Sequence, residues 1–337
     1  MNRKPIDYLI ISMKGIAMGA ADAVPGVSGG TIALIAGIYQ ELIATISNIK
    51  LSLITTLRQE GFKAAWKALN GNFLVALVTG ILISFVSFMR LAKYLIEKHP
   101  ILIWSFFFGL IIASIYYVGK QVNQWRTNTF AALLIGTAVA FYISTLPSLA
   151  SSTNQFFLFF AGAIAICAMI LPGISGSFIL VILGAYKTLS DAIHDFDFKK
   201  LAVFVLGAVV GLLSFSRVLK WLFKHYYNLT MALLTGFIVG SLNKIWPWKL
   251  TQTVIEKETG TVMPLSDLTP LNTLNLYQQT INNFETYKIV TEKSILPFEY
   301  YAVNDGANPY LFPAIGLMFL GFSTIFLLEK LGSKQVQ

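Results

Sequence analysis

Long apolar segments alternate with shorter polar ones along most of the chain. The apolar segments lie at residues 6–24, 29–47, 73–95, 101–119, 129–149, 156–171, 176–193, 200–223, 228–246 and 309–329. Several of them reach the 18 or more residues that a helix needs to cross a bilayer. The strict alternation typical of strands in a membrane barrel is not seen. The pattern therefore predicts an all-α polytopic membrane protein.

Two polar stretches interrupt this pattern, and their charges differ in sign. Residues 48–72 are mainly basic, whereas residues 247–308 carry seven acidic and four basic side chains. Lysine and arginine accumulate in the cytoplasmic loops of membrane proteins. We therefore predict a cytoplasmic insert at 48–72, an extracytoplasmic loop at 247–308, and cytoplasmic N- and C-termini.

The composition narrows the functional classes. The chain is 55% hydrophobic and only 12% charged, about half the charge of a soluble domain. Its net charge of +9 is scattered, so we expect no nucleic-acid partner. The single Cys167 and three separated histidines predict no disulfide framework, no metal site and no cofactor.

The chain also repeats itself. Residues 24–46 align without gaps to residues 171–193, and the blocks at 87–95 and 214–222 also match. Three apolar spans separate the two Pro-Gly units, and an odd number of crossings inverts the second copy relative to the first. Inverted repeats with broken helices are typical of secondary transporters.

The repeat predicts the domain organisation. We expect a first repeat at 1–149 with a hairpin at 6–47, an inverted second repeat at 150–246 with a hairpin at 156–193, and a last transmembrane helix and tail at 309–337. About six further transmembrane helices complete the bundle. Each Pro-Gly unit is either two full crossings or one re-entrant hairpin, and its glycines favour the hairpin because they permit close packing.

The two hairpin tips have the chemistry of an anion site. A helix that restarts after a break presents unpaired N–H groups and a partial positive charge, which suit phosphate or carboxylate. We predict substrate binding by Pro25, Gly26, Ser28, Gly29, Gly30 and Thr31 in the first copy, and by Pro172, Gly173, Ser175, Gly176 and Ser177 in the second. The alternative is that these residues only end a helix and allow close packing.

Five of the charged residues within the apolar segments are candidates for a functional role. Arg90 and Arg217 occupy matched positions, where they either bind the anion or anchor the helices at the interface. Lys14 and Asp22 share one stripe of the first helix but lie about 12 Å apart, too far for a direct pair. We assign Lys14, Asp22 and Glu41 to either ion coupling or capping.

The segments KGIAMGAADAVPGVSGGTIALIAGIYQEL and LPGISGSFILVILGAYKTL resemble the paired signatures of bacterial polyprenyl-phosphate transporters, the PopT-type undecaprenyl-phosphate translocases, formerly a domain of unknown function. The resemblance covers about residues 8–246. It implies that the protein is not an enzyme but a flippase of the cytoplasmic (inner) membrane. This flippase would return undecaprenyl phosphate, the lipid carrier of cell-wall precursors, from the outer to the inner leaflet. The implied partners are this polyprenyl phosphate, membrane lipids and a coupling proton or sodium ion.

Other functions remain open at this point. Integral-membrane undecaprenyl-diphosphate phosphatases share a Pro-Gly-x-Ser motif, but theirs continues with arginine and is accompanied by clustered glutamates. Here glycines follow, at Gly29 and Gly176, and Glu41 is the only glutamate in either hairpin unit. An ion-coupled transporter of a small soluble anion would use the same tips. A scaffold would leave the paired tips unexplained.

Overall fold

The computed structural model describes residues 3–22, 28–146, 154–256, 258–269, 271–274, 279, 286–304 and 306–333. The first half contains α1 (Pro5–Asp22), α2 (Gly29–Ile35), α3 (Tyr39–Ser47), α4 (Ser52–Glu60), α5 (Phe62–Ala68), α6 (Gly71–Lys98), α7 (Pro100–Gly119) and α8 (Thr127–Thr145). The second half contains α9 (Gln155–Ile170), α10 (Gly176–Ile182), α11 (Ala185–His194), α12 (Phe198–His225), α13 (Tyr227–Gly240), the 3-10 helices η1 (Ser241–Ile245), η2 (Leu265–Asp267) and η3 (Leu271–Thr273), strands β1 (Lys249–Glu256), β2 (Val262–Pro264) and β3 (Tyr287–Ser294), then α15 (Pro297–Val303) and α16 (Leu311–Ser333).

The helices have the length and surface of a membrane bundle. Among the described residues, α7, α8 and α12 are each long and apolar enough to cross a membrane, and two bent helix pairs reach the same criterion. Large apolar side chains face outward along these helices, including Leu134, Phe141 and Leu206, each at least half exposed. An apolar exterior of this extent fits lipid and not water. The predicted all-α polytopic membrane protein is confirmed.

The element boundaries follow the predicted apolar segments closely, but the two polar stretches are more ordered than expected. Residues 48–72 form the short helices α4 and α5. The stretch 247–308 contains a three-stranded antiparallel sheet in the order β2-β1-β3, in which Val254 lies opposite Ile289 and Met263. Its strands are rich in threonine, valine and isoleucine, residues that favour strands.

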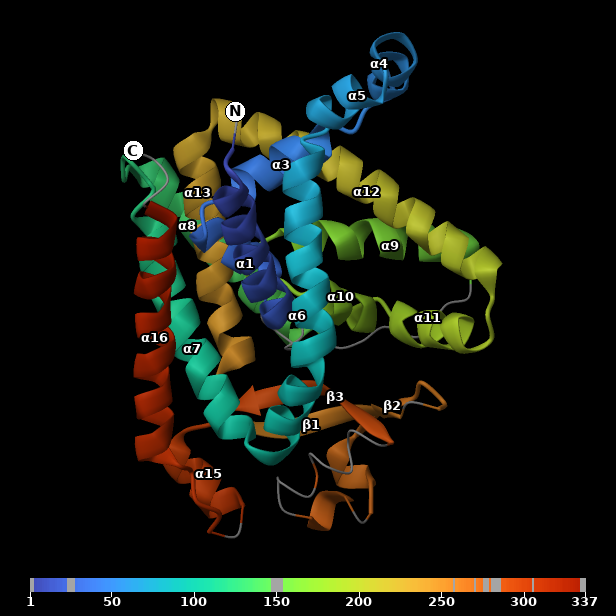
Figure 1. The fold of residues 1–337 in the computed structure, drawn as a ribbon. Helices are drawn as coiled ribbons and strands as arrows, with labels where there is room; N and C mark the ends of the chain where they lie inside the picture. The colour runs from blue at the N-terminus through green and yellow to red at the C-terminus, as the bar shows by residue number, and fades with distance from the viewer. Residues whose placement is uncertain are drawn as a thin grey trace.

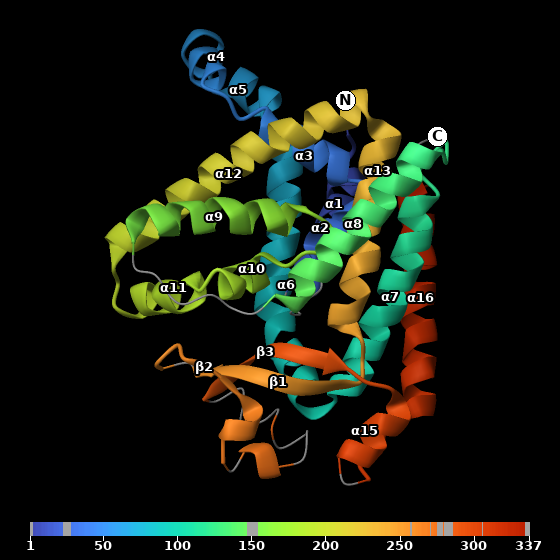
Figure 2. The same ribbon diagram turned by 180° about the vertical axis from the view of Figure 1, so that it is seen from behind.

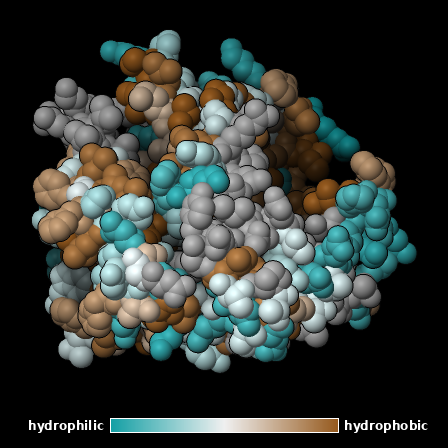
Figure 3. Space-filling view, turned by 90° about the horizontal axis from the view of Figure 1, so that it is seen from below, coloured by the Kyte–Doolittle hydropathy of each residue, from teal (hydrophilic) through white to brown (hydrophobic). Residues whose placement is uncertain are grey.

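The two ends of the molecule differ in content. Both termini and α4–α5 lie at one end, and the sheet and α15 lie at the other (Figure 1). The view from behind shows the same division, with α9 to α12 extending to one side of the bundle (Figure 2). Seen from the sheet end, the surface mixes hydrophilic residues with apolar patches (Figure 3).

The helices pack in corresponding pairs. Helix α1 packs against α6 as α9 packs against α12, and α7 packs against α16 as α13 packs against α8. The contacts match in detail. A Cβ added at Gly109 would collide with the α16 carbonyl of Met318, and one added at Gly236 would collide with the α8 carbonyl of Leu133. Glycine is required at both positions because the helix backbones touch there.

Both hairpins turn back after a short helix. Helices α2 and α10 have seven residues each, about 10 Å of helix, which is far short of a bilayer. Helices α2 and α3 meet at 113°. This geometry favours a re-entrant hairpin over two full crossings at the first Pro-Gly unit.

Candidate functional site

The two hairpin tips meet inside the molecule, although 142 residues separate Thr31 from Gly173. The Gly173 N–H donates to Thr31 Oγ1 over 3.0 Å. The Tyr39 hydroxyl donates to the carbonyl of Ile170 over 3.1 Å, and Tyr39 is almost fully buried. Hydroxyl groups of the first copy therefore pair with backbone groups of the second copy.

The first tip is closed by groups of the chain itself. Ser28 caps α2 and accepts a hydrogen bond from the Gly30 N–H at 3.1 Å. The Asp22 carboxylate accepts from the Gly29 N–H at 2.6 Å. The Thr31 N–H donates to the Ser28 carbonyl at 3.0 Å. Residues 28–36 are all buried, so the start of α2 has no free N–H group to offer a ligand.

Two charges of α1 complement the dipole of α2. Asp22 lies at the N-terminus of α2, and the Lys14 ammonium donates to the carbonyl of Ala36 at its C-terminal end, 2.8 Å away. The eight-residue spacing of these side chains spans about 12 Å, close to the length of α2. An anion at the start and a cation at the end of a helix are both stabilising. Lys14 and Asp22 therefore contact opposite ends of α2 and not each other.

The second tip is open. Ser175 occupies the N-cap position of α10, but its side chain makes no capping hydrogen bond. Its hydroxyl lies 3.0 Å from that of Ser177, which is exposed. Among the described residues, none accepts a hydrogen bond from the N–H groups of Gly176 and Ser177. Gly176 is buried and Ser177 is exposed, so of these two groups the Ser177 N–H is the one at the surface of the tip.

Gly173 sets the path of the second tip. Its φ is +82°, and a Cβ there would lie 2.6 Å from the carbonyl oxygen of Phe237 on α13. Only glycine adopts this conformation without strain while its backbone lies so close to a neighbouring helix. The turn directs the Gly173 N–H toward Thr31 and leaves Ser175 at the edge of a pocket.

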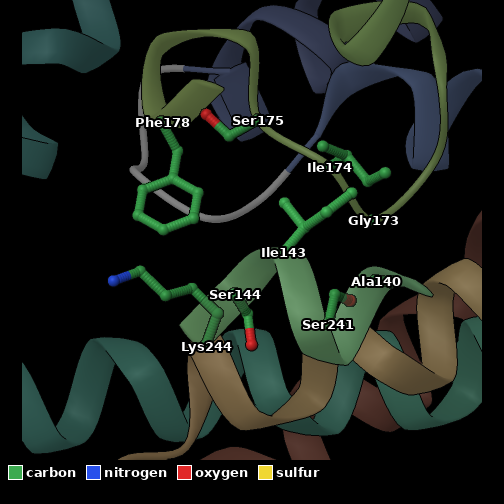
Figure 4. Close-up of a pocket in the computed structure, with 9 residues that line it drawn as sticks. All are labelled: Ala140, Ile143, Ser144, Gly173, Ile174, Ser175, Phe178, Ser241 and Lys244. Carbon is green, nitrogen blue, oxygen red and sulfur yellow. The ribbon is translucent and has the colours of Figure 1, made fainter. Parts of the chain in front are cut away.

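This pocket lies between the second tip and the end of the bundle. Its empty space of about 330 Å³ includes open solvent at its mouth. Gly173, Ser175 and Phe178 line one wall, and Ser144 and Lys244 line the opposite wall with other residues of α8 and η1 (Figure 4). Three serines, Ser144, Ser175 and Ser241, thus line one pocket with the Lys244 side chain and several apolar residues.

Lys244 belongs to a charged cluster that sequence reasoning missed. Its ammonium lies 3.4 Å from Glu292 Oε2 on β3 and 4.7 Å from the centre of the Phe178 ring. Lys249 on β1 lies 3.4 Å from the same oxygen and donates to the Lys244 carbonyl at 2.6 Å. Lys249 is 6% exposed. Spacing alone gave no signal, because Glu292 lies 43 and 48 residues beyond its partners.

Burial and the neighbouring charges shift the pKa values of Lys249 and Glu292. Burial lowers the pKa of Lys249 to about 8, although the Glu292 carboxylate opposes this shift. Burial alone would raise the pKa of Glu292, but the charges of Lys249 and Lys244 together lower it below its ordinary value. Two ammonium groups and one carboxylate leave one excess positive charge beside the pocket.

Apart from Pro172 at the second tip, the remaining predicted residues lie away from the tips or outside the described parts. Arg217 donates to the carbonyl of Ile49 at 3.2 Å, and therefore contacts the end of the first hairpin and neither tip. Arg90 lies on α6, and its side chain is outside the described residues, as are Pro25 and Gly26. Pro172 is buried beside Gly173.

The Glu41 carboxylate is hydrogen-bonded to side chains far from either tip. Both of its oxygens accept from Arg3, at 2.6 and 2.7 Å, and one also accepts from Asn70 at 2.9 Å. These bonds tie the N-terminal segment to α3 and to the start of α6. Glu41 therefore joins these segments at the end of the bundle and does not lie at either tip.

Comparison with known proteins decides the family. Residues 18–263 match a family model described as undecaprenyl phosphate translocase-like. The chain belongs to this family. A polyprenyl-phosphate transporter of Vibrio cholerae is 38% identical over 99% of this chain and all of its own length. One of Staphylococcus aureus is 34% identical over 72% of this chain and 88% of its own. No solved structure matches with significance. The names indicate a transporter and not an enzyme, as predicted.

Proposed function

We propose that this protein transports undecaprenyl phosphate, or a similar polyprenyl phosphate, from the outer to the inner leaflet of the bacterial cytoplasmic membrane. This step would recycle the lipid carrier for cell-envelope synthesis. The names of the two relatives support the substrate class. The observation that carries the proposal is the meeting of two glycine-rich tips, one with free N–H groups, beside a pocket that contains an ammonium group.

The phosphate head binds at the second tip in the conformation described. The free N–H groups of Gly176 and Ser177 and the hydroxyl of Ser175 are donors that suit phosphate oxygens. In the first copy, the matched N–H of Gly29 already holds a carboxylate, that of Asp22. The Asp22 carboxylate at the first tip thus occupies the position that we assign to the phosphate at the second tip.

Asp22 links the first tip to a coupling proton. The phosphate head and the Asp22 carboxylate compete for the same Gly29 N–H group. A proton on Asp22 removes its charge, which weakens this bond and frees the first tip for the head. In this proposal Ser28, Gly29, Gly30 and Thr31 bind the substrate only after Asp22 is released.

The two repeats supply alternating access. The matched contacts of Gly109 with α16 and Gly236 with α8 support an inverted repeat in which the halves interlock. Rocking of such halves about a central site is the usual transport motion of inverted-repeat carriers. Both termini lie at one end with the basic α4–α5 segment, which supports a cytoplasmic position for that end.

Leaflet exchange in proteoliposomes tests the proposal. The purified protein is reconstituted with radiolabelled undecaprenyl phosphate, and the fraction accessible from outside is followed over time. Protein-dependent exchange of the phosphate, but not of undecaprenol, is expected. Release of inorganic phosphate from undecaprenyl diphosphate would instead favour the phosphatase. Uptake of a small soluble anion without lipid exchange would favour the anion transporter.

A further inference from the structure

The cluster of Lys244, Lys249 and Glu292 is not explained by the stability of the sheet alone. Lys249 is fixed, because its ammonium donates to the Lys244 carbonyl at 2.6 Å and lies 4.2 Å from the centre of the Trp104 ring. Lys244 is held more loosely. Both ammonium groups lie 3.4 Å from Glu292 Oε2, longer than the 2.7–2.9 Å of a strong charge-assisted hydrogen bond, but among the described residues only Lys249 also donates to a carbonyl.

Lys244 faces the pocket as well as the cluster. Its side chain is 21% exposed and extends past the Phe178 ring on the wall opposite Ser175 (Figure 4). Glu292 lies on β3, a strand of the 247–308 stretch, and so this stretch supplies a carboxylate to a residue of the pocket. The matched position in the first repeat is Tyr117, so this ammonium is present in one copy only.

We propose that Lys244 binds the phosphate monoester at the second tip, and that Glu292 holds Lys244 when the pocket is empty. When the phosphate enters, the Lys244 ammonium turns from Glu292 to the phosphate, and Glu292 stays paired with Lys249. Lys249 thus keeps the carboxylate from being left buried and unpaired, which would be costly. The 247–308 stretch thus binds Lys244 reversibly through Glu292. This inference rests on the proposed function.

Two substitutions should change phosphate affinity in opposite directions. Lys244→Gln removes the ammonium and should weaken binding of geranylgeranyl phosphate about 10-fold. Glu292→Gln removes the competing carboxylate and should tighten binding about 3-fold. An ion pair with only a structural role would make both changes act with the same sign.

The measurement is calorimetric titration of the full-length protein in detergent. The ligands are geranylgeranyl phosphate, inorganic phosphate and the neutral alcohol geranylgeraniol. Lys120→Gln, an exposed lysine at the end of α7, is the matched control and should bind as the wild type does. Lys244→Arg retains the charge and should bind within about threefold of wild type. Thermal unfolding checks that each variant is folded.

Wild-type affinity for geranylgeranyl phosphate in the Lys244→Gln variant would overturn the inference. Equal weakening by Lys244→Gln and Glu292→Gln would also overturn it. If Glu292→Gln does not fold, the contrast between Lys244→Gln and Lys244→Arg decides alone. Equal affinities for inorganic phosphate and the lipid would support the Lys244 site but contradict the lipid substrate. Leaflet exchange by the wild type with no effect of Lys244→Gln would contradict this inference and leave the proposed function standing.

Discussion

The two hairpin tips share a motif but differ in what fills them. At the first tip, Asp22 and Ser28 accept the N–H groups that begin α2, and residues 28–36 are buried. At the second tip, the matched N–H groups of α10 have no partner among the described residues, and Ser177 is exposed. One backbone design is therefore present in a closed and an open form.

Part of the difference lies in the motif, where Ser28 caps α2 but Ser175 makes no capping bond, and part arises from side chains outside the motif. Asp22 is matched by Met169 in the second copy, and Lys14 is matched by Ala161. The charged groups that occupy the ends of α2 thus have no equivalents around α10. The repeat specifies the shape of both tips, whereas Asp22 of α1 fills the first tip and Lys14 binds the opposite end of α2.

The largest expected effect is at Gly173, where the tips join. Gly173→Ala places a Cβ 2.6 Å from the Phe237 carbonyl oxygen at a φ of +82°, and should cost about 3 kcal/mol of stability. Gly37→Ala is the control, because Gly37 has a φ of +71° but nothing within 4 Å of the added carbon. It should cost about 1 kcal/mol. Thermal unfolding in detergent compares them, and equal losses would contradict the close contact.

The next effect concerns the hydrogen bond between the copies. Thr31→Val leaves the Gly173 N–H without its acceptor and should cost about 2 kcal/mol. Thr235→Val is matched in burial, but its hydroxyl only donates to the Met231 carbonyl of its own helix, so its loss should cost less than about 1 kcal/mol. The same unfolding measurement applies. Equal effects would show that the tips are not coupled through this bond.

A smaller effect should follow from Asp22→Asn. The amide keeps an acceptor for the Gly29 N–H but removes the charge at the start of α2, so stability should fall by about 1 kcal/mol. Because the variant resembles protonated Asp22, its leaflet exchange should depend less on pH than that of the wild type. Unchanged pH dependence would remove Asp22 from coupling.

The free energy of unfolding of the 247–308 stretch should increase as pH rises from about 8. The folded pKa of Lys249 is about 8 and the ordinary value is 10.5, so the unfolded chain binds more protons between these values. Stability from this group should therefore rise with pH in this window, by at most about 1.4 kcal/mol per pH unit. Tryptophan fluorescence during unfolding, to which Trp246 and Trp248 contribute, measures this dependence. Lys249→Met should abolish the slope, and an equal slope in that variant would refute the assignment.

The smallest effect is expected at Arg217. Its guanidinium is exposed and donates to the Ile49 carbonyl, so Arg217→Ala should change stability by less than about 0.5 kcal/mol. Leaflet exchange provides the sharper measurement. A strong loss of exchange with normal folding would show that Arg217 reaches the substrate in another conformation.

The sequence predicted the spans and the tips for physical reasons that also limit it. Apolar periodicity and the paired Pro-Gly motifs are local signals, so helices such as α7 and the cap Ser28 follow directly from them. The Lys244–Glu292 pair depends on how β3 of the 247–308 stretch packs near η1, which no local sequence pattern encodes. The sequence does not distinguish capping from coupling at Asp22, because its partner Gly29 becomes a neighbour only when the hairpin closes.

The most direct test of the account is whether a phosphate head protects the second tip. In a Cys167→Ser background, a cysteine is placed at position 175 or, as control, at position 28, which is 3% exposed. The account predicts that Ser175→Cys reacts with a charged thiol reagent, that Ser28→Cys does not, and that undecaprenyl phosphate but not undecaprenol slows the reaction. A Ser175→Cys reaction that undecaprenyl phosphate does not slow would contradict binding of the head at this tip.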